Sequence, residues 1–234
     1  MWRDNLSRFG LIALATDMTI EGDALRLLPD GCRLHVTRIA FDNPTTAENL
    51  KRTGPHLRAA SDLLVPGVEL KGIGFGCTSA SAVLGDEVQT AIGDRAPIST
   101  PVAAALRGFR ALKVDRIALM TPYLRATTDL VGDHFEANGL GVVSRMSMEY
   151  ADDRDMALLP GDAIVDFARQ SDHPDAQALF LSCTALPAVA VIDRIEQALG
   201  KPVVSSNLAL FWSMLDLAQI PASGPGRLFQ VRTW

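Results

Sequence analysis

Two short segments of this sequence carry a cysteine in the same chemical setting. Gly74-Phe-Gly-Cys77-Thr-Ser-Ala80 and Phe180-Leu-Ser-Cys183-Thr-Ala-Leu186 each join an apolar run to a Cys-Thr pair and then to small residues. The two cysteines lie 106 residues apart in a chain of 234, which is near the size of a half-chain. A thiolate can act as a nucleophile or as a base. We therefore predict that Cys77 and Cys183 face each other across a small carboxylate-bearing substrate.

Each of these cysteines is predicted to stand at the carboxyl end of a strand, just before a helix. Ligands of open parallel α/β sheets bind outside the carboxyl ends of the strands. The unpaired N–H groups and the dipole of a helix N-terminus lower the pKa of a thiol and attract a carboxylate. Thr78, Ser79 and Thr184 add hydroxyl groups beside the same amides. A lone cysteine in an apolar segment is usually a small buried hydrophobe, and we assign that structural role to Cys32.

Short apolar runs alternate with amphipathic stretches along the whole chain, a pattern typical of right-handed β-α-β units and a mostly parallel sheet. Strands are predicted over residues 9–15, 33–40, 72–76, 116–120, 141–146, 178–182 and 202–205. Helices are predicted over residues 45–65, 79–92, 102–113, 126–138, 162–170, 187–199 and 208–217. In the first of these helices, Pro55 is expected to break or restart the helix.

The repeated Cys-Thr segment predicts two similar α/β lobes related by a pseudo-twofold axis. A boundary is expected near residues 97–101, where Arg-Ala-Pro-Ile-Ser-Thr-Pro interrupts the helical periodicity. We assign residues 1–100 and 206–234 to an N-terminal lobe that carries Cys77. Residues 101–205 are assigned to a second lobe that carries Cys183.

The composition is that of an ordinary globular protein, with 48% hydrophobic and 21% charged residues. A formal net charge of −5 and the lack of a basic run argue against nucleic acid or an anionic membrane as a partner. No segment has the roughly 18 continuous apolar residues of a spanning helix, and the N-terminus lacks a secretory signal. We expect a cytoplasmic homo-oligomer that acts on a small carboxylate.

The cysteine and histidine residues do not form the known metal or disulfide patterns. Three widely spaced cysteines make neither a disulfide framework nor a CxxC motif, and four scattered histidines give no ligand pair. The glycines of Gly72-Ile-Gly-Phe-Gly76 lack the full GxGxxG spacing of a dinucleotide site. We therefore expect no metal and no organic cofactor.

Five segments together resemble the maleate isomerases and the arylmalonate decarboxylases, within the wider aspartate/glutamate and hydantoin racemase superfamily. In chain order they are Phe9-Gly-Leu-Ile-Ala-Leu-Ala-Thr-Asp17, Gly76-Cys77-Thr-Ser79, Met120-Thr-Pro-Tyr123, Leu181-Ser-Cys183-Thr-Ala185 and Pro202-Val-Val-Ser-Ser-Asn207. The resemblance covers nearly the whole chain. It implies two Rossmann-like lobes with parallel sheets, an active site in the cleft between them, and the two cysteines on opposite faces of the substrate.

The resemblance also implies roles for the residues beside the cysteines. Thr78, Ser79 and the Tyr123 hydroxyl would hold one carboxylate and stabilise enolate-like charge. From the second lobe, Thr184 and the backbone N–H of Ala185 would donate to the same charge, as oxyanion donors do elsewhere.

Two reactions remain open for such a pair of thiols. The decarboxylases of this superfamily typically keep only the second cysteine and have glycine at the first position, so Cys77 speaks against decarboxylation. In a racemase, one cysteine removes the α-proton and the other returns a proton from the opposite face. In a maleate-type isomerase, one thiolate adds to a double bond, the resulting single bond rotates, and the thiolate leaves.

Asp17 favours a substrate that contains nitrogen. The resemblance to the maleate isomerases implies an asparagine in this loop, in a Ser-Ser-Asn-Thr-type segment, where it helps to hold a substrate carboxylate. An aspartate would repel a dicarboxylate but could pair with an ammonium group, unless it only caps a helix. The stretch from Ala13 to Asn43 also resembles a subset associated with ectoine and hydroxyectoine utilisation, which implies a diaminobutyrate- or hydroxyectoine-type substrate.

Two other classes of protein compete with the enzyme hypothesis. A non-catalytic protein could sense a small acid between two lobes, but binding alone does not require a nucleophile on each face. A thiol redox protein is disfavoured because the cysteines are far apart in the sequence and form no CxxC motif.

Overall fold

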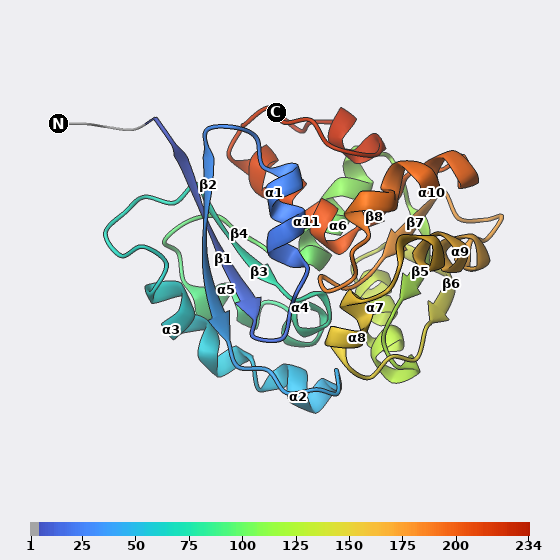
Figure 1. Ribbon diagram of the computed structural model, residues 1–234, viewed down its shortest axis with the longest axis horizontal. Helices are drawn as coiled ribbons and strands as arrows, with labels where there is room; N and C mark the ends of the chain where they lie inside the picture. Colours follow the sequence, from blue (N-terminus) through green and yellow to red (C-terminus); the bar gives the residue numbers. More distant parts are fainter. Residues whose placement is uncertain (1–4) are drawn as a thin grey trace.

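The computed structural model describes residues 5–234, and its eight strands form two separate parallel sheets (Figure 1). The first sheet has the order β2-β1-β3-β4 and the second has the order β6-β5-β7-β8. The strands are β1 Ser7–Leu14, β2 Cys32–Ile39, β3 Gly72–Gly76, β4 Ile98–Ser99, β5 Arg116–Thr121, β6 Gly141–Ser147, β7 Ala178–Leu181 and β8 Val203–Ser205. The same order in both sheets confirms the α/β fold of two repeated Rossmann-like lobes.

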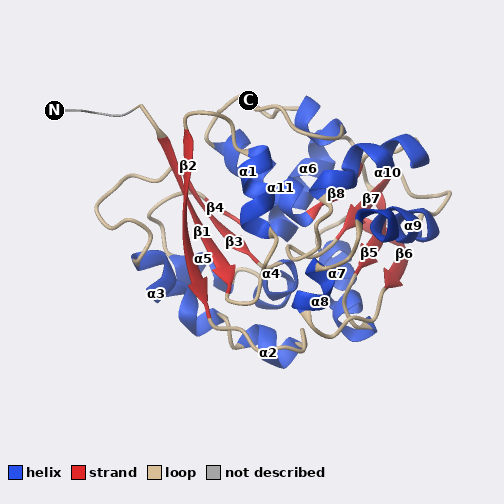
Figure 2. Ribbon diagram, in the orientation of Figure 1, coloured by secondary structure: helices blue, strands red, loops and turns tan. Residues whose placement is uncertain are grey.

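Helices pack around and between the two sheets, as Figure 2 shows. The α-helices are α1 Ile20–Leu27, α2 Ala47–Lys51, α3 Leu57–Asp62, α4 Thr78–Leu84, α5 Glu87–Ile92, α6 Pro101–Ala111, α7 Arg125–Ala137, α8 Asp153–Ala157, α9 Gly161–Ser171, α10 Ile192–Leu199 and α11 Ser206–Leu217. Short 3-10 turns are η1 Gly54–His56, η2 Val189–Val191 and η3 Arg227–Gln230. No helix within residues 5–234 is both long and apolar enough to cross a membrane.

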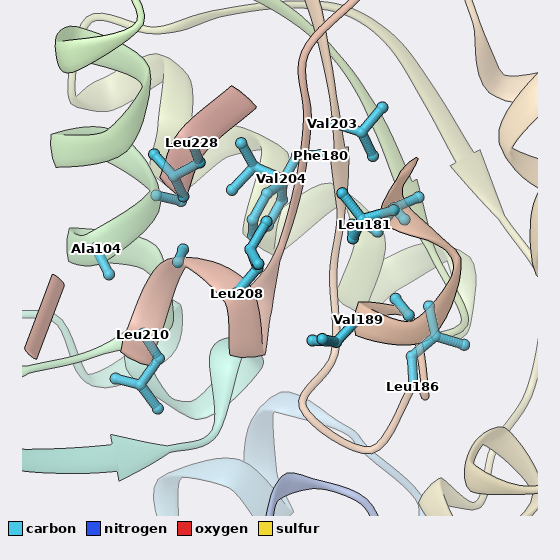
Figure 3. Packing of buried hydrophobic residues seen from close by; sticks show 14 of the residues in the cluster. Ala104, Phe180, Leu181, Leu186, Val189, Val203, Val204, Leu208, Leu210 and Leu228 are labelled. Atoms are coloured by element: carbon cyan, nitrogen blue, oxygen red, sulfur yellow. The ribbon is translucent and has the colours of Figure 1, made fainter. Parts of the chain in front are cut away.

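Helix α11 joins the lobes because it contacts β3 and β4 of the first sheet and β8 of the second. Every residue from Ser206 to Asp216 is buried, so this helix packs on all sides. The approach to β3 depends on a missing side chain, since a Cβ on Gly74 would stand 2.9 Å from Sδ of Met214. One apolar cluster therefore runs from α11 into the second lobe, where Leu208 packs near Phe180 and Val204 (Figure 3).

The structure corrects several predicted elements. The helix predicted over residues 45–65 is divided into α2, η1 and α3 around Pro55, and the one over residues 79–92 is divided at Gly85. Gly85 has a φ of +55°, a conformation that favours glycine and ends α4. Strand β4 and helices α1 and α8 were not predicted, because β4 has only two residues and the two helices are short. The predicted lobe boundaries stay a prediction.

Candidate active site

Cys77 and Cys183 stand at similar places in the two lobes, one and two residues after the end of the third strand of each sheet. Cys77 caps the N-terminus of α4, where its Sγ accepts a hydrogen bond from the N–H of Ala80 at 3.4 Å. Cys183 lies in a loop and has a φ of +89°. Such a conformation is uncommon for a residue other than glycine, and strain of this kind clusters at functional sites. Both thiols are free and buried.

A small cavity lies between the two cysteine turns. Its lining residues are Leu14, Phe41, Thr45, Leu50, Cys77, Thr78, Ser79, Tyr123, Asp153, Cys183, Thr184 and Ala185. Seven of the eight residues predicted for the site therefore line one cavity, and Asp17 is the exception. Their placement brings both thiols to one space between the lobes, while the role of each residue stays a prediction.

Hydroxyl groups connect the two cysteine turns to each other and to α11. The Thr184 hydroxyl donates to the carbonyl oxygen of Gly76 at 3.2 Å, and the Thr78 hydroxyl donates to Oγ of Ser206 at 2.7 Å. The amide of Asn207 donates to the carbonyl oxygen of Thr184 at 2.8 Å. Both threonine protons are thus used within the protein, and these side chains fix the relative position of the turns.

Burial controls the protonation of Cys77. Loss of water raises the pKa of this thiol to about 12, although the N–H of Ala80 and the hydroxyl of Ser79 lower it. The negative charges of Asp17 and Asp153 raise it further. The N–H group acts in the expected direction, but desolvation of the sulfur outweighs it.

Cys183 is protonated for the same reason, because burial raises its pKa above the usual range. The Tyr123 hydroxyl is the main opposing influence, since it hydrogen-bonds the thiol and lowers this pKa. Ser182 donates to Oη of Tyr123 at 3.3 Å, which leaves the phenolic proton free for the sulfur or for a ligand. Burial also raises the pKa of Tyr123, so the phenol remains a donor.

Asp17 lies behind the cavity wall. Its Oδ1 accepts hydrogen bonds from the N–H groups of Thr19 and Ile20 at 2.8 and 2.9 Å, so it caps the start of α1. Its Oδ2 is buried and has no hydrogen-bond partner among the described residues. Burial raises the pKa of this carboxyl group, and the nearby charge of Asp153 raises it as well.

Asp153 lines the cavity and was missed by the sequence analysis. It begins α8 and is only 3% exposed. Three aspartates at positions 152, 153 and 155 have the pattern of a solvated helix start, so nothing in the sequence singles out the buried one. Across residues 5–234, no group of three or more His, Cys, Asp or Glu side chains could hold a metal ion.

Comparison with known proteins agrees with this arrangement. The arylmalonate decarboxylase family model matches residues 75–229, which is more than half of the chain. The chain belongs to the arylmalonate decarboxylase family. The maleate isomerase of Nocardia farcinica is 26% identical over 237 residues, covering 94% of each chain. The arylmalonate decarboxylase of Bordetella bronchiseptica is 33% identical over 138 residues, covering 57% of this chain and 58% of that one.

A solved structure of another protein shows the same fold as this chain. It is a Nocardia farcinica maleate cis-trans isomerase mutant with a covalently bound succinylcysteine intermediate. The TM-score is 0.86 at 24% identity, over 96% of this chain and 98% of that one. With maleate isomerases among its relatives, the chain is an enzyme of the isomerase class.

Proposed function

We propose that this enzyme is a racemase or epimerase of a small, amino-acid-like carboxylate. The observation that supports the proposal is the position of the two thiols, since equivalent turns of the two lobes place Cys77 and Cys183 on one cavity. Two acid–base groups on a shared cavity can remove a proton from one face of a carbon and return one to the other.

The proposed reaction needs one thiolate and one thiol. The thiolate takes the α-proton, and the electron pair left on carbon is delocalised into the substrate carboxylate as an enolate. The opposite thiol then gives its proton to the other face, which leaves the two sulfurs in exchanged protonation states. The Tyr123 hydroxyl, the Ser79 hydroxyl and the N–H of Ala185 are the donors proposed to stabilise the enolate.

The first thiolate must form when the substrate binds, because burial keeps both thiols protonated in the closed cavity. A positive charge on the substrate would favour this ionisation, since an opposite charge nearby stabilises a thiolate and lowers its pKa. The proton lost from the sulfur passes to solvent before the cavity closes. The proposal therefore favours a substrate that carries an ammonium group next to the carboxylate.

An alternative function is cis-trans isomerisation by addition of a thiolate to a double bond. The maleate isomerases among the relatives support it, and a succinylcysteine intermediate has been captured in one of them. Under this alternative, Cys77 is the nucleophile and Cys183 the proton donor. Decarboxylation is disfavoured because Cys77 stands where the resemblance to the decarboxylases implies glycine. A non-catalytic acid-binding function is disfavoured because the relatives of this chain are named as enzymes.

Several finer points belong to the same proposal. The resemblance of the stretch from Ala13 to Asn43 supports a diaminobutyrate- or hydroxyectoine-type substrate. We also propose that the enzyme works in the cytoplasm as a homo-oligomer, with neither a metal nor an organic cofactor.

Proton NMR in deuterated water tests the proposal directly. Candidate amino acids are incubated with the wild type and with Cys77→Ser and Cys183→Ser. A racemase incorporates deuterium at the α-carbon, and each single variant loses turnover but exchanges the proton of at most one enantiomer. Conversion of maleate without exchange, lost in Cys77→Ser and only slowed in Cys183→Ser, would favour the addition route.

Cys32→Ser is the matched control for these variants. Cys32 lies in a separate groove beside α1, so this substitution should leave activity near the wild-type level. Full activity in the double variant that lacks both Cys77 and Cys183 thiols would contradict the proposed function in either form.

A further inference from the structure

The wall of the cavity between the thiols carries a negative charge, although the proposed substrate carries a carboxylate. None of the described residues that line it is Lys, Arg or His, whereas Asp153 is one of the lining residues. A substrate carboxylate could therefore bind there only against an existing negative charge. The cavity wall is suited to a ligand that also carries a positive charge.

Asp153 is held in a fixed orientation at this wall. Its Oδ1 accepts a hydrogen bond from the Asn43 amide at 2.8 Å, and its Oδ2 accepts one from the Thr16 hydroxyl at 2.5 Å. The Asn43 oxygen also accepts the backbone N–H of Asp153 at 3.2 Å. Each carboxylate oxygen has a second lone pair, so both can accept another donor. These contacts orient the carboxylate, and both partners, Thr16 and Asn43, are uncharged.

Asp17 provides a second, independent observation on the same side of the site. Its Oδ2 is buried without a hydrogen-bond partner among the described residues, and the residue is 3% exposed. The charge of Asp153 acts on Asp17, and that of Asp17 acts on both thiols, which places Asp17 close to the cavity beside Thr184. From behind the wall Asp17 does not meet the ligand itself, so it acts on the cavity through its negative charge.

We propose that Asp153 binds a protonated nitrogen of the substrate and thereby selects zwitterionic or cationic amino acids over dicarboxylates. Asp17 reinforces the negative potential from behind the wall. The proposal rests on the proposed function only in taking this cavity as the substrate site. It assigns substrate choice to a residue on α8 of the second lobe, held in place by Thr16 and Asn43 of the first lobe.

The experiment compares three small acids as probes by isothermal titration calorimetry at fixed pH and ionic strength. The probes are 2-aminobutyrate, butyrate, which lacks only the nitrogen, and maleate. The wild type should bind 2-aminobutyrate roughly ten- to hundredfold more tightly than butyrate, the range that a hydrogen bond to a charged group supports. Butyrate or maleate binding as tightly as 2-aminobutyrate, or no binding of any probe, would overturn the proposal without any variant.

Asp153→Asn should remove most of this preference and should strengthen the binding of maleate. Asp153→Glu keeps the charge and should retain part of the preference. Asp155→Asn is the matched control, since it removes the same charge from an exposed position of the same helix and should change nothing. Retention of the full preference in a folded Asp153→Asn variant would refute the assignment.

Together with the deuterium-incorporation experiment, the titrations distinguish a failure of this inference from a failure of the proposed reaction. Selective binding of 2-aminobutyrate without incorporation of deuterium at its α-carbon, or at that of any amino acid tested, would defeat the racemase proposal but keep the cation subsite. Deuterium incorporation into an amino acid, with no loss of preference in Asp153→Asn, would support the racemase proposal and refute the cation subsite.

Discussion

The hydroxyl of Thr184 donates to the carbonyl oxygen of Gly76 at 3.2 Å, so the turn of one cysteine is bonded directly to the turn of the other. Gly76 immediately precedes Cys77, and Thr184 immediately follows Cys183. A hydrogen bond between residues 108 positions apart thus holds the two cysteine turns against each other. Catalysis by two groups on one substrate is sensitive to the distance between the groups, since a misplacement of about 1 Å can cost roughly a hundredfold in rate.

Thr184→Val should therefore lower both the rate of the reaction and the stability of the fold. Valine keeps the shape but leaves the carbonyl oxygen of Gly76 without this donor, which should cost about 1–3 kcal/mol of folding free energy. We expect a loss of at least tenfold in the rate of α-proton exchange measured by NMR. Thr184→Ser keeps the hydroxyl and should recover most of the rate; equal losses in both variants would contradict the positioning role.

The backbone of Cys183 is in a conformation that glycine tolerates better than any other residue. Its φ is +89°, whereas that of Cys77 is −151°, within the extended region. Cys183→Gly should therefore be more stable than Cys183→Ala by about 1–2 kcal/mol. At Cys77 the order should reverse, because glycine there only adds flexibility to the unfolded chain.

Urea unfolding of the four variants measures this difference. Glycine and alanine both remove the thiol, so loss of the sulfur contacts cancels in each pair. If Cys183→Ala were as stable as Cys183→Gly, the left-handed backbone at this position would store no strain.

The buried thiols should make the protein less stable in alkali. The unfolded chain loses the Cys77 proton near pH 8.5, whereas the folded chain keeps it until about pH 12. Between these values the unfolded state binds fewer protons, so the free energy of unfolding falls as the pH rises, by at most about 1.4 kcal/mol per pH unit for one thiol.

Chemical denaturation at several pH values between 9 and 11 measures that slope. Cys77→Ala lacks one of the two groups and should show a shallower decline than the wild type. A wild-type slope no steeper than that of the variant would mean that the Cys77 thiol ionises in the folded protein as readily as in the unfolded chain.

Asp17→Asn should stabilise the protein at neutral pH. Asparagine can still accept the N–H groups of Thr19 and Ile20 with its Oδ1, but it removes a buried charge whose Oδ2 is unpaired among the described residues. Burial raises the pKa of Asp17, so wild-type stability falls as the pH rises from about 4, the unfolded pKa, through the folded value. The advantage of asparagine should therefore disappear below about pH 4.

Thermal unfolding at pH 3.5 and pH 7.5 tests this prediction. Asp17→Ala removes the cap together with the charge and should lose about 1 kcal/mol relative to asparagine. An asparagine variant that is less stable than the wild type at neutral pH would show that the carboxylate is stabilised by a partner in the folded protein.

The sequence by itself determined the elements that carry the chemistry. Continuous apolar runs such as residues 72–76 and 178–181 are typical of strands buried on both faces, and the helices between them favour a parallel arrangement. The Cys-Thr pair repeated after two of these strands predicted the two equivalent turns. Local periodicity was insufficient for α1, α8 and β4, which are short and owe their conformation to contacts with distant segments.

Only the tertiary structure decided which charges reach the cavity. Asp17 and Asp153 look alike as acidic residues near helix starts, yet one caps α1 behind the wall and the other lines the cavity. Their placement depends on how the lobes meet, through Thr16 and Asn43 on one side and α8 on the other. The thiol pKa values are decided by the tertiary structure for the same reason: a sequence shows a helix N-terminus, but desolvation depends on every atom that surrounds the sulfur.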